Sequence, residues 1–202
     1  MSKIKTKLKE NREYRGAGLF ETKDDYIVEG YAAMWQPYEL FRHDGITYYE
    51  KVNKEAFEEA DMSDVIFQFD HQGMVHARQS NGTLQLEVDD VGLKVTADLS
   101  KTTEARNLHE NIKAGNIKAM SWAFIIAEEA YNSETRTQTI RKVEKVYDVS
   151  AVSIPANSDT YINARTIDGV IELQKRSERA HEEARLRLQI QLQTEGEYQY
   201  EN

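Results

Sequence analysis

The chain has 202 residues, a formal net charge of −9, 40% hydrophobic residues and no cysteine. This length predicts one domain with an appendage or two small domains, and the apolar content is sufficient for an ordinary core. The absence of cysteine excludes disulfides, cysteine nucleophiles and thiolate zinc sites. The acidic balance disfavours a general nucleic-acid binder, because such proteins gain affinity by neutralising phosphates.

The first residues, M-S-K-I-K-T-K-L-K-E-N-R, are basic, but no apolar segment follows them. We therefore expect no signal peptide, and no run of the sequence is long and apolar enough to span a bilayer. We interpret residues 1–13 as a basic, flexible N-terminus. Neither a membrane nor a nucleic acid is predicted as a partner.

Two strands and a short helix are predicted in the first third of the chain. Residues 25–35 are rich in β-branched and aromatic side chains, and Pro37 ends this run. Residues 46–52 have the same character and predict a second strand. Asn53 can cap a short helix over residues 54–60, where apolar side chains recur at helical spacing.

A meander is predicted in the middle of the chain. Residues 64–70 form a short apolar run that reads as a strand. Asn81-Gly82 is a hairpin signal, and residues 84–88 and 93–99 then alternate between apolar and polar side chains. Two alternating runs joined by a tight turn predict adjacent antiparallel strands.

After residue 99 the spacing of apolar residues changes from every second residue, as in a strand, to every third or fourth residue, as in a helix. Thr102 or Thr103 can cap a helix that Gly115 ends, with apolar residues on one face. A strand over residues 119–127 follows, and residues 139–155 complete the strands.

After Arg165 the composition shifts to Glu, Gln, Arg, Ala and Leu, which favour helix, over residues 170–194. The run R-L-R-L-Q-I-Q-L-Q places apolar residues on opposite sides of such a helix. We therefore expect a helix that packs on two sides or pairs with a partner. The predicted organisation is a folded domain over residues 14–165 and a helical or disordered extension over residues 166–202.

The fold class predicted from these elements is mainly β with inserted helices (α+β). About eight short strands, mostly in antiparallel meanders, close most easily as a small barrel or sandwich.

His71 and Ser121 are the first candidates for chemistry. Each occupies a strand position where an apolar residue is expected, and fifty residues separate them. If the fold brings them together, the serine gains a general base and becomes a nucleophile. The alternatives are a satisfied hydroxyl and an ordinary surface or core histidine. The G-x-S-x-G signature of many serine hydrolases is absent.

A catalytic histidine also needs a partner that fixes its tautomer. Asp148 is an acidic residue in an otherwise apolar strand, where a charge requires a partner. Asp70 competes for this role, but neighbouring strand residues point to opposite faces, which disfavours it beside His71. Glu144 is a further candidate. The structural alternative for Asp148 is a salt bridge to a residue such as Arg141.

A metal site is the remaining alternative. The candidate ligands are His71 with His76, the His43-Asp44 pair and the Asp89-Asp90 pair. Their spacing fits neither the helical zinc motif nor a calcium-binding loop, and aspartates are common in turns. We therefore predict no metal and no other cofactor.

Six sequence blocks between about Tyr26 and Arg165 carry a resemblance to a known family. They read V-E-G-Y-A-A-M-W, E-K-V-N-K-E-A-F, F-D-H with H-A-R, G-T-L-Q-L-E-V-D-D-V-G-L, A-G-N-I-K-A-M-S-W-A-F and D-V-S-A-V-S-I-P-A-N. In this order and spacing the sequence resembles the prohead (capsid maturation) serine proteases of tailed bacteriophages.

The resemblance implies a fold similar to that of the herpesvirus assembly protease, a small antiparallel β-barrel with helices around it. It implies Ser121 as nucleophile, His71 as general base and Asp148 as third member of a triad. Two positions depart from the family pattern. Asp148 stands where a glutamate is usual, and His76-Ala77-Arg78 stands where a small hydrophobic residue precedes a glycine.

The resemblance also implies a biological role. Such proteases act inside the immature capsid, in the host cytoplasm. They cleave the scaffolding segment of the major capsid protein, or a separate scaffold, and they digest themselves. The implied partners are the major capsid protein and further copies of the chain. The extension from about Thr166 would then be a targeting or scaffold-binding segment, which self-cleavage could remove. The alternative is a non-catalytic internal scaffold or assembly protein with a protease-like domain.

Overall fold

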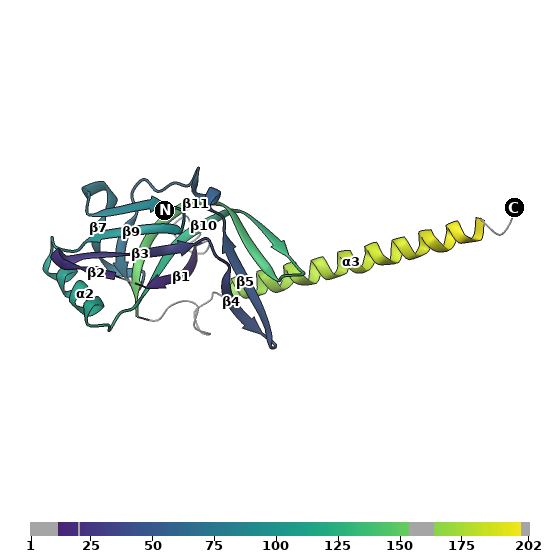
Figure 1. The fold of residues 1–202 in the computed structure, drawn as a ribbon, viewed down its shortest axis with the longest axis horizontal. Coiled ribbons are helices and arrows are strands. Elements are labelled where there is room, and N and C mark those ends of the chain that lie inside the picture. The colour runs from purple at the N-terminus through teal and green to yellow at the C-terminus, as the bar shows by residue number, and fades with distance from the viewer. Residues whose placement is uncertain (1–11, 20, 154–163, 199–202) are drawn as a thin grey trace, which may run out of the picture.

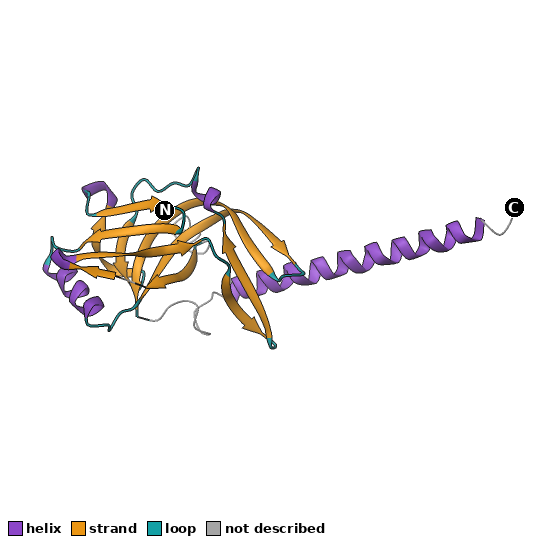
Figure 2. Cartoon of the chain, viewed as in Figure 1, coloured by secondary structure: helices purple, strands orange, loops and turns teal. Residues whose placement is uncertain are grey.

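A computed structural model describes residues 12–19, 21–153 and 164–198. Strands form the body of the molecule, and helices lie at its margins (Figure 2). The strands in these ranges are β1 (Glu13–Leu19), β2 (Glu21–Lys23), β3 (Ile27–Met34), β4 (Tyr38–His43), β5 (Ile46–Val52), β6 (Ile66–Phe69), β7 (Gln72–Arg78), β8 (Leu84–Val88), β9 (Gly92–Asp98), β10 (Ala119–Asn132) and β11 (Thr137–Val152). The α-helices are α2 (Thr103–Lys113) and α3 (Ala164–Tyr198).

The strands form two sheets. One has the order β1-β10-β11-β5-β4, with β6 also paired to β11 and β7 paired to β6, and the other has the order β2-β3-β9-β8. β5 and β6 lie parallel to opposite ends of β11, whereas the other pairs are antiparallel. The mainly β prediction is confirmed. In the described part of the chain the sheets do not close into a barrel, so the barrel stays a prediction.

The hydrophobic core lies between the two sheets and under α2. From Ala119 to Ile125 β10 is buried on both faces, because β1 and β11 flank it and other elements cover it. Trp122 stacks on Phe124 with 3.6 Å between ring centroids, and Phe57 packs against Trp122 at 5.5 Å. Burying each such aromatic side chain contributes about 1.5–3 kcal/mol. The core therefore fixes the strand that carries Ser121.

The helix α2 agrees with its sequence prediction. Thr102 is the N-cap, and its Oγ1 accepts a hydrogen bond from the backbone N–H of Ala105 at 3.1 Å. Such a cap contributes about 0.5–2 kcal/mol. Gly115 adopts a φ of +76° just after the helix ends, a conformation that glycine tolerates better than other residues.

Several predicted elements need correction. Gly82 does adopt a left-handed φ, but Asn81-Gly82 does not join a hairpin, because β7 pairs with β6 and β8 pairs with β9. This turn instead links the two sheets. The predicted helix over residues 54–60 is a 3-10 turn at Lys54–Phe57.

Four strands, β1, β2, β4 and β7, were absent from the prediction. None of them carries a sustained hydrophobic alternation, and pairing with neighbouring strands rather than local pattern makes them extended.

The helix α3 is longer than the predicted residues 170–194 and projects from the sheets as a rod, at the end opposite to α2 (Figure 1). Near its start Val170 packs with Leu40, Phe41 and Tyr48. Further along, its apolar residues are exposed and include Leu186, Leu188 and Ile190. The expected two-sided packing is therefore not made within the described chain. None of the described helices is long and apolar enough to cross a membrane.

The predicted flexible N-terminus falls almost wholly on residues 1–11, which lie outside the described residues. The chain between β11 and α3, residues 154–163, also lies outside them, so the predicted boundary after residue 165 stays a prediction.

Candidate active site

The three predicted site residues form one hydrogen-bonded chain. His71 Nε2 lies 2.7 Å from Ser121 Oγ, and His71 Nδ1 lies 2.5 Å from Asp148 Oδ1. Ser121 lies on β10, Asp148 on β11, and His71 in the turn between β6 and β7. The structure thus brings together side chains that are 50 and 77 residues apart in sequence.

Strand pairing explains why these side chains meet. β10 and β11 are antiparallel, with Ser121 opposite Ser150 and Ala123 opposite Asp148. Directly opposite residues point to the same face, with their Cβ atoms about 4.5–5.5 Å apart. β6 lies parallel to β11 over residues 148–151, so its end delivers His71 to the face that carries Ser121 and Asp148.

The turn that holds His71 has an unusual backbone. Asp70 and His71 have φ values of +47° and +57°, a region that costs a non-glycine residue roughly 1–2 kcal/mol. Asp70 offsets this cost by accepting hydrogen bonds from the Ser153 backbone N–H and the Ser153 hydroxyl, each at 2.9 Å. Asp70 N–H also donates to Ala151 O at 2.9 Å. Asp70 therefore anchors the turn and does not contact the His71 ring.

Sequence reasoning missed Ser150, which is fully buried beside Asp148. Its hydroxyl donates to Asp148 Oδ1 at 2.8 Å and accepts from the His71 backbone N–H at 3.2 Å. Residues two apart on a strand share a face, so the D-V-S spacing was the signal that could have identified it. Ser150 thus connects the carboxylate to the backbone that carries the imidazole.

Sequence reasoning also missed Tyr14, because β1 was not predicted. Tyr14 lies opposite Ala123 on β10, and its ring meets the His71 ring edge-on with centroids 4.7 Å apart. No pattern around Tyr14 predicts this contact, which depends on the pairing of β1 with β10.

The site is well enclosed. Ser121 is 2% exposed, and the His71 side chain is 15% exposed. Hydrogen bonds are stronger electrostatically in such surroundings than in water, and unpaired polar groups cost more. Asp148 is satisfied by the two donors His71 and Ser150, so its carboxylate is held in one orientation.

The competing residues lie elsewhere. Glu144 is exposed on the surface, and Arg141 lies 3.8 Å from Glu128 rather than pairing with Asp148. Arg141 is therefore not the partner of Asp148, which instead lies against the basic residue His71, and Glu144 lies away from the site.

The candidate metal ligands do not gather into a site. His43 pairs with its exposed neighbour Asp44, and Asp89 accepts hydrogen bonds from Val91 and Gly92 in a turn. Burial lowers the pKa of His76 below its ordinary value. Within residues 12–19, 21–153 and 164–198, no group of three or more His, Asp or Glu side chains is arranged to hold a metal ion.

The arrangement has the connectivity that activates a serine hydroxyl. A neutral imidazole that donates from Nδ1 to a carboxylate presents Nε2 as an acceptor, and Nε2 can then remove the proton of Ser121. The same imidazole can return that proton to a leaving group.

A family model described as caudovirus prohead serine protease matches residues 14–172. The match extends from β1 into the first turns of α3 and includes His71, Ser121 and Asp148. No curated protein and no solved structure matches the chain.

Proposed function

The chain belongs to the caudovirus prohead serine protease family, and from this membership we propose that it is the endopeptidase of prohead maturation, with Ser121 as its nucleophile. The observation that carries the proposal is the continuous hydrogen-bonded chain from Ser121 through His71 to Asp148. Membership alone implies protease activity in general, and this chain of contacts supports the roles that we propose for the three residues.

In the proposed mechanism Ser121 Oγ attacks the scissile carbonyl carbon while its proton moves to His71 Nε2. The C–N bond then breaks, and His71 returns the proton to the leaving amine. Water attacks the resulting acyl-enzyme, with His71 again acting as base, and Ser121 regains its proton. General acid–base catalysis of this kind contributes about 10²–10⁴-fold in rate.

Asp148 has the orienting role. Its Oδ1 accepts from His71 Nδ1, which keeps the proton on that nitrogen and favours the imidazolium formed during attack. The family pattern usually has the longer glutamate at this position. Ser150 supports the shorter aspartate by binding both the carboxylate and the His71 backbone.

We further propose the scaffolding segment of the major capsid protein and the chain itself as substrates, inside the immature capsid in the host cytoplasm. The exposed apolar residues of α3 suit contact with scaffold helices or with further copies of the chain. Autoproteolysis within this extension would release the enzyme from such contacts.

The test is co-expression of the chain with the capsid protein of the same phage, followed by intact-mass spectrometry. We expect defined fragments with the wild-type chain and none with Ser121→Ala. Ser133→Ala, in the loop that joins β10 and β11, is the matched control and should cleave normally. Identical fragments with all three chains would identify a host protease. Intact capsid protein in every sample would favour the non-catalytic assembly role.

A further inference from the structure

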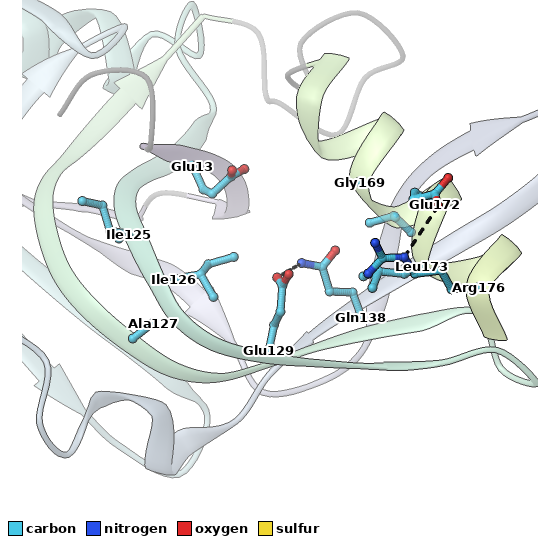
Figure 3. Close-up of a pocket in the computed structure, with 11 residues that line it drawn as sticks. Glu13, Ile125, Ile126, Ala127, Glu129, Gln138, Gly169, Glu172, Leu173 and Arg176 are labelled. Carbon is cyan, nitrogen blue, oxygen red and sulfur yellow. Dashed lines mark hydrogen bonds and ion pairs between the residues drawn. The ribbon is translucent and has the colours of Figure 1, made fainter. Parts of the chain in front are cut away.

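A cavity of about 550 Å³ lies between the first described turns of α3, the far half of β10 and the start of β1 (Figure 3). Its polar lining consists of Glu13, Glu129, Gln138, Glu172 and Arg176. This volume is in the range of small-ligand sites, which combine an apolar wall with a few convergent polar groups. The cavity contains none of the three proposed catalytic residues.

Gln138 has an unsatisfied acceptor at this cavity. The residue is only 4% exposed, and its Nε2 donates to Glu129 Oε2 at 2.5 Å. Its Oε1 is buried and has no hydrogen-bond partner in the described part of the chain. Figure 3 shows this oxygen turned away from Glu129, toward α3. A buried acceptor without a donor is unfavourable, so the site is suited to a ligand that donates hydrogen bonds.

The charges around the cavity favour a cation. Arg15, the nearest buried cation, is engaged by both Glu50 and Glu13. Arg176 lies 3.6 Å from Glu172.

Glu129 forms no ion pair among the described residues, although it accepts from Gln138. Desolvation raises the pKa of the Glu129 carboxyl above its ordinary value, and the charges of Glu13 and Glu50 raise it further. A bound cation would oppose this rise in pKa, because its positive charge favours the ionised carboxylate.

We propose that this cavity binds the side chain of a lysine or arginine presented by a polypeptide. The ammonium or guanidinium group would donate to Gln138 Oε1 and pair with Glu129. The methylene stem would lie on the apolar wall, which includes Ile125, Ile126 and Leu173. This binding site does not depend on the proposed catalytic mechanism.

The basic side chain can come from either of two polypeptides, a substrate or the N-terminal part of the chain itself. Ile125 follows Ser121 by four residues on β10, about 13 Å along an extended strand, so a substrate could place a basic residue here some distance from its scissile bond. The alternative source is the chain's own N-terminal sequence, which carries Lys3, Lys5, Lys7 and Lys9 ahead of β1. Both sources present the same chemistry to the cavity.

The test uses the full-length chain with Ser121→Ala, which prevents self-digestion, and follows the Gln138 side-chain amide signals by NMR. The probe is N-acetyl-arginine methylamide, and its neutral isostere N-acetyl-citrulline methylamide is the control ligand. We expect the arginine probe to shift these signals and to bind at least roughly tenfold more tightly than the citrulline probe, because charge-assisted hydrogen bonds are lost with the charge.

Three variants locate the site. Glu129→Gln and Gln138→Met should each weaken the arginine probe roughly tenfold. Binding to Gln138→Met is followed through the backbone amide signal of Glu129, because this variant lacks the Gln138 side-chain amide. Glu128→Gln is the matched control, because Glu128 is the neighbouring exposed carboxylate on β10, does not line the cavity and changes the net charge equally. Its affinity should be unchanged. Glu129→Gln removes the charge but keeps an oxygen that can accept from Gln138, so it tests the proposal even if Gln138→Met fails to fold.

A variant with all four lysines replaced by glutamine distinguishes the sources. If the N-terminal lysines fill the cavity, the probe should bind this variant at least roughly fivefold more tightly, because an internal competitor at high effective concentration is removed. Unchanged affinity assigns the cavity to a separate polypeptide. Absence of binding in both chains, equal affinity for the two probes, or equal effects of Glu129→Gln and Glu128→Gln would overturn the proposal.

Discussion

Ser150 donates a hydrogen bond to Asp148 from a position two residues further along the same strand, with 2.8 Å between Ser150 Oγ and Asp148 Oδ1. The same hydroxyl accepts from the backbone N–H of His71. Ser150 lies opposite Ser121 on the paired strand, but its hydroxyl bonds to Asp148 and to the His71 backbone, so it acts on the proposed reaction through these two residues. We regard it as a positioning residue, and its removal should affect turnover rather than substrate binding.

The first prediction is that Ser150→Ala lowers kcat roughly tenfold while KM stays nearly constant, because a hydrogen bond to a charged group is lost. Ser150→Thr keeps the hydroxyl and should restore much of the activity. The NMR signal of the His71 Nδ1 proton should move in Ser150→Ala and stay closer to its original position in Ser150→Thr. An unchanged signal and unchanged kcat in Ser150→Ala would contradict the positioning role.

The second prediction separates the two aspartates near His71. Asp148→Asn should lower kcat by about 10²–10⁴-fold, because an amide can favour the wrong imidazole tautomer. Asp70→Asn should stay within about threefold of wild type, since asparagine tolerates a positive φ and its oxygen can still accept from Ser153. Steady-state cleavage of a capsid-derived peptide measures both. Comparable losses in the two variants would mean that Asp70 contributes to catalysis as well.

The third prediction concerns the buried pair of Arg15 and Glu50, which links β1 to β5. Arg15 Nε and Nη2 donate to the two carboxylate oxygens at 2.6 and 2.9 Å, and Tyr38 also contacts Glu50. Arg15→Met should lower the free energy of unfolding by about 3–5 kcal/mol, because it leaves a buried carboxylate without its cation.

The double variant Arg15→Met with Glu50→Leu should recover most of that loss, since it removes the buried charge as well. Equilibrium denaturation of the single and double variants measures the coupling. Strictly additive losses would show that the two side chains do not stabilise each other.

The fourth prediction is a pH dependence of stability at the end of β9. Desolvation raises the pKa of Asp98, but hydrogen bonds from Ser100 and Lys101 outweigh it and lower the pKa to about 2. Because this value is below that of the unfolded chain, the stabilisation is present above about pH 4 and is lost as the pH falls toward 2.

Asp98→Asn should therefore reduce the free energy of unfolding by about 1 kcal/mol near pH 6, an amount limited by solvent screening. The difference from wild type should shrink as the pH falls through 2, because Asp98 is half protonated at that pH and becomes neutral, like asparagine, below it. Thermal melting at several pH values measures this. A difference that is constant with pH would exclude ionisation of Asp98 as its cause.

The sequence alone determined the features that depend on local pattern. The N-cap and helical period of α2, and the alternation of β8 and β9, were predicted and are confirmed. The membership in the prohead protease family, inferred from six ordered blocks, is also confirmed. Ser121 and Asp148 could be selected because polar residues at apolar strand positions require partners. His71 was selected on the same ground, but the expected strand position is wrong, because His71 lies in the turn between β6 and β7. The catalytic roles of the three residues remain a prediction.

Only the tertiary structure decided which strands pair, and therefore which side chains meet in the site. A period of two residues fixes the face of each side chain, but it does not say which strand lies alongside. The parallel pairing of β6 with β11 brings His71 to Asp148, and the addition of β1 to β10 places Tyr14 against His71. The roles of Ser150 and Asp70, and the acidic cavity beside Gln138, depend on the same non-local contacts. These pairings minimise the free energy of the two packed sheets as a whole. A short stretch of sequence does not determine that free energy, because it depends on contacts between distant residues.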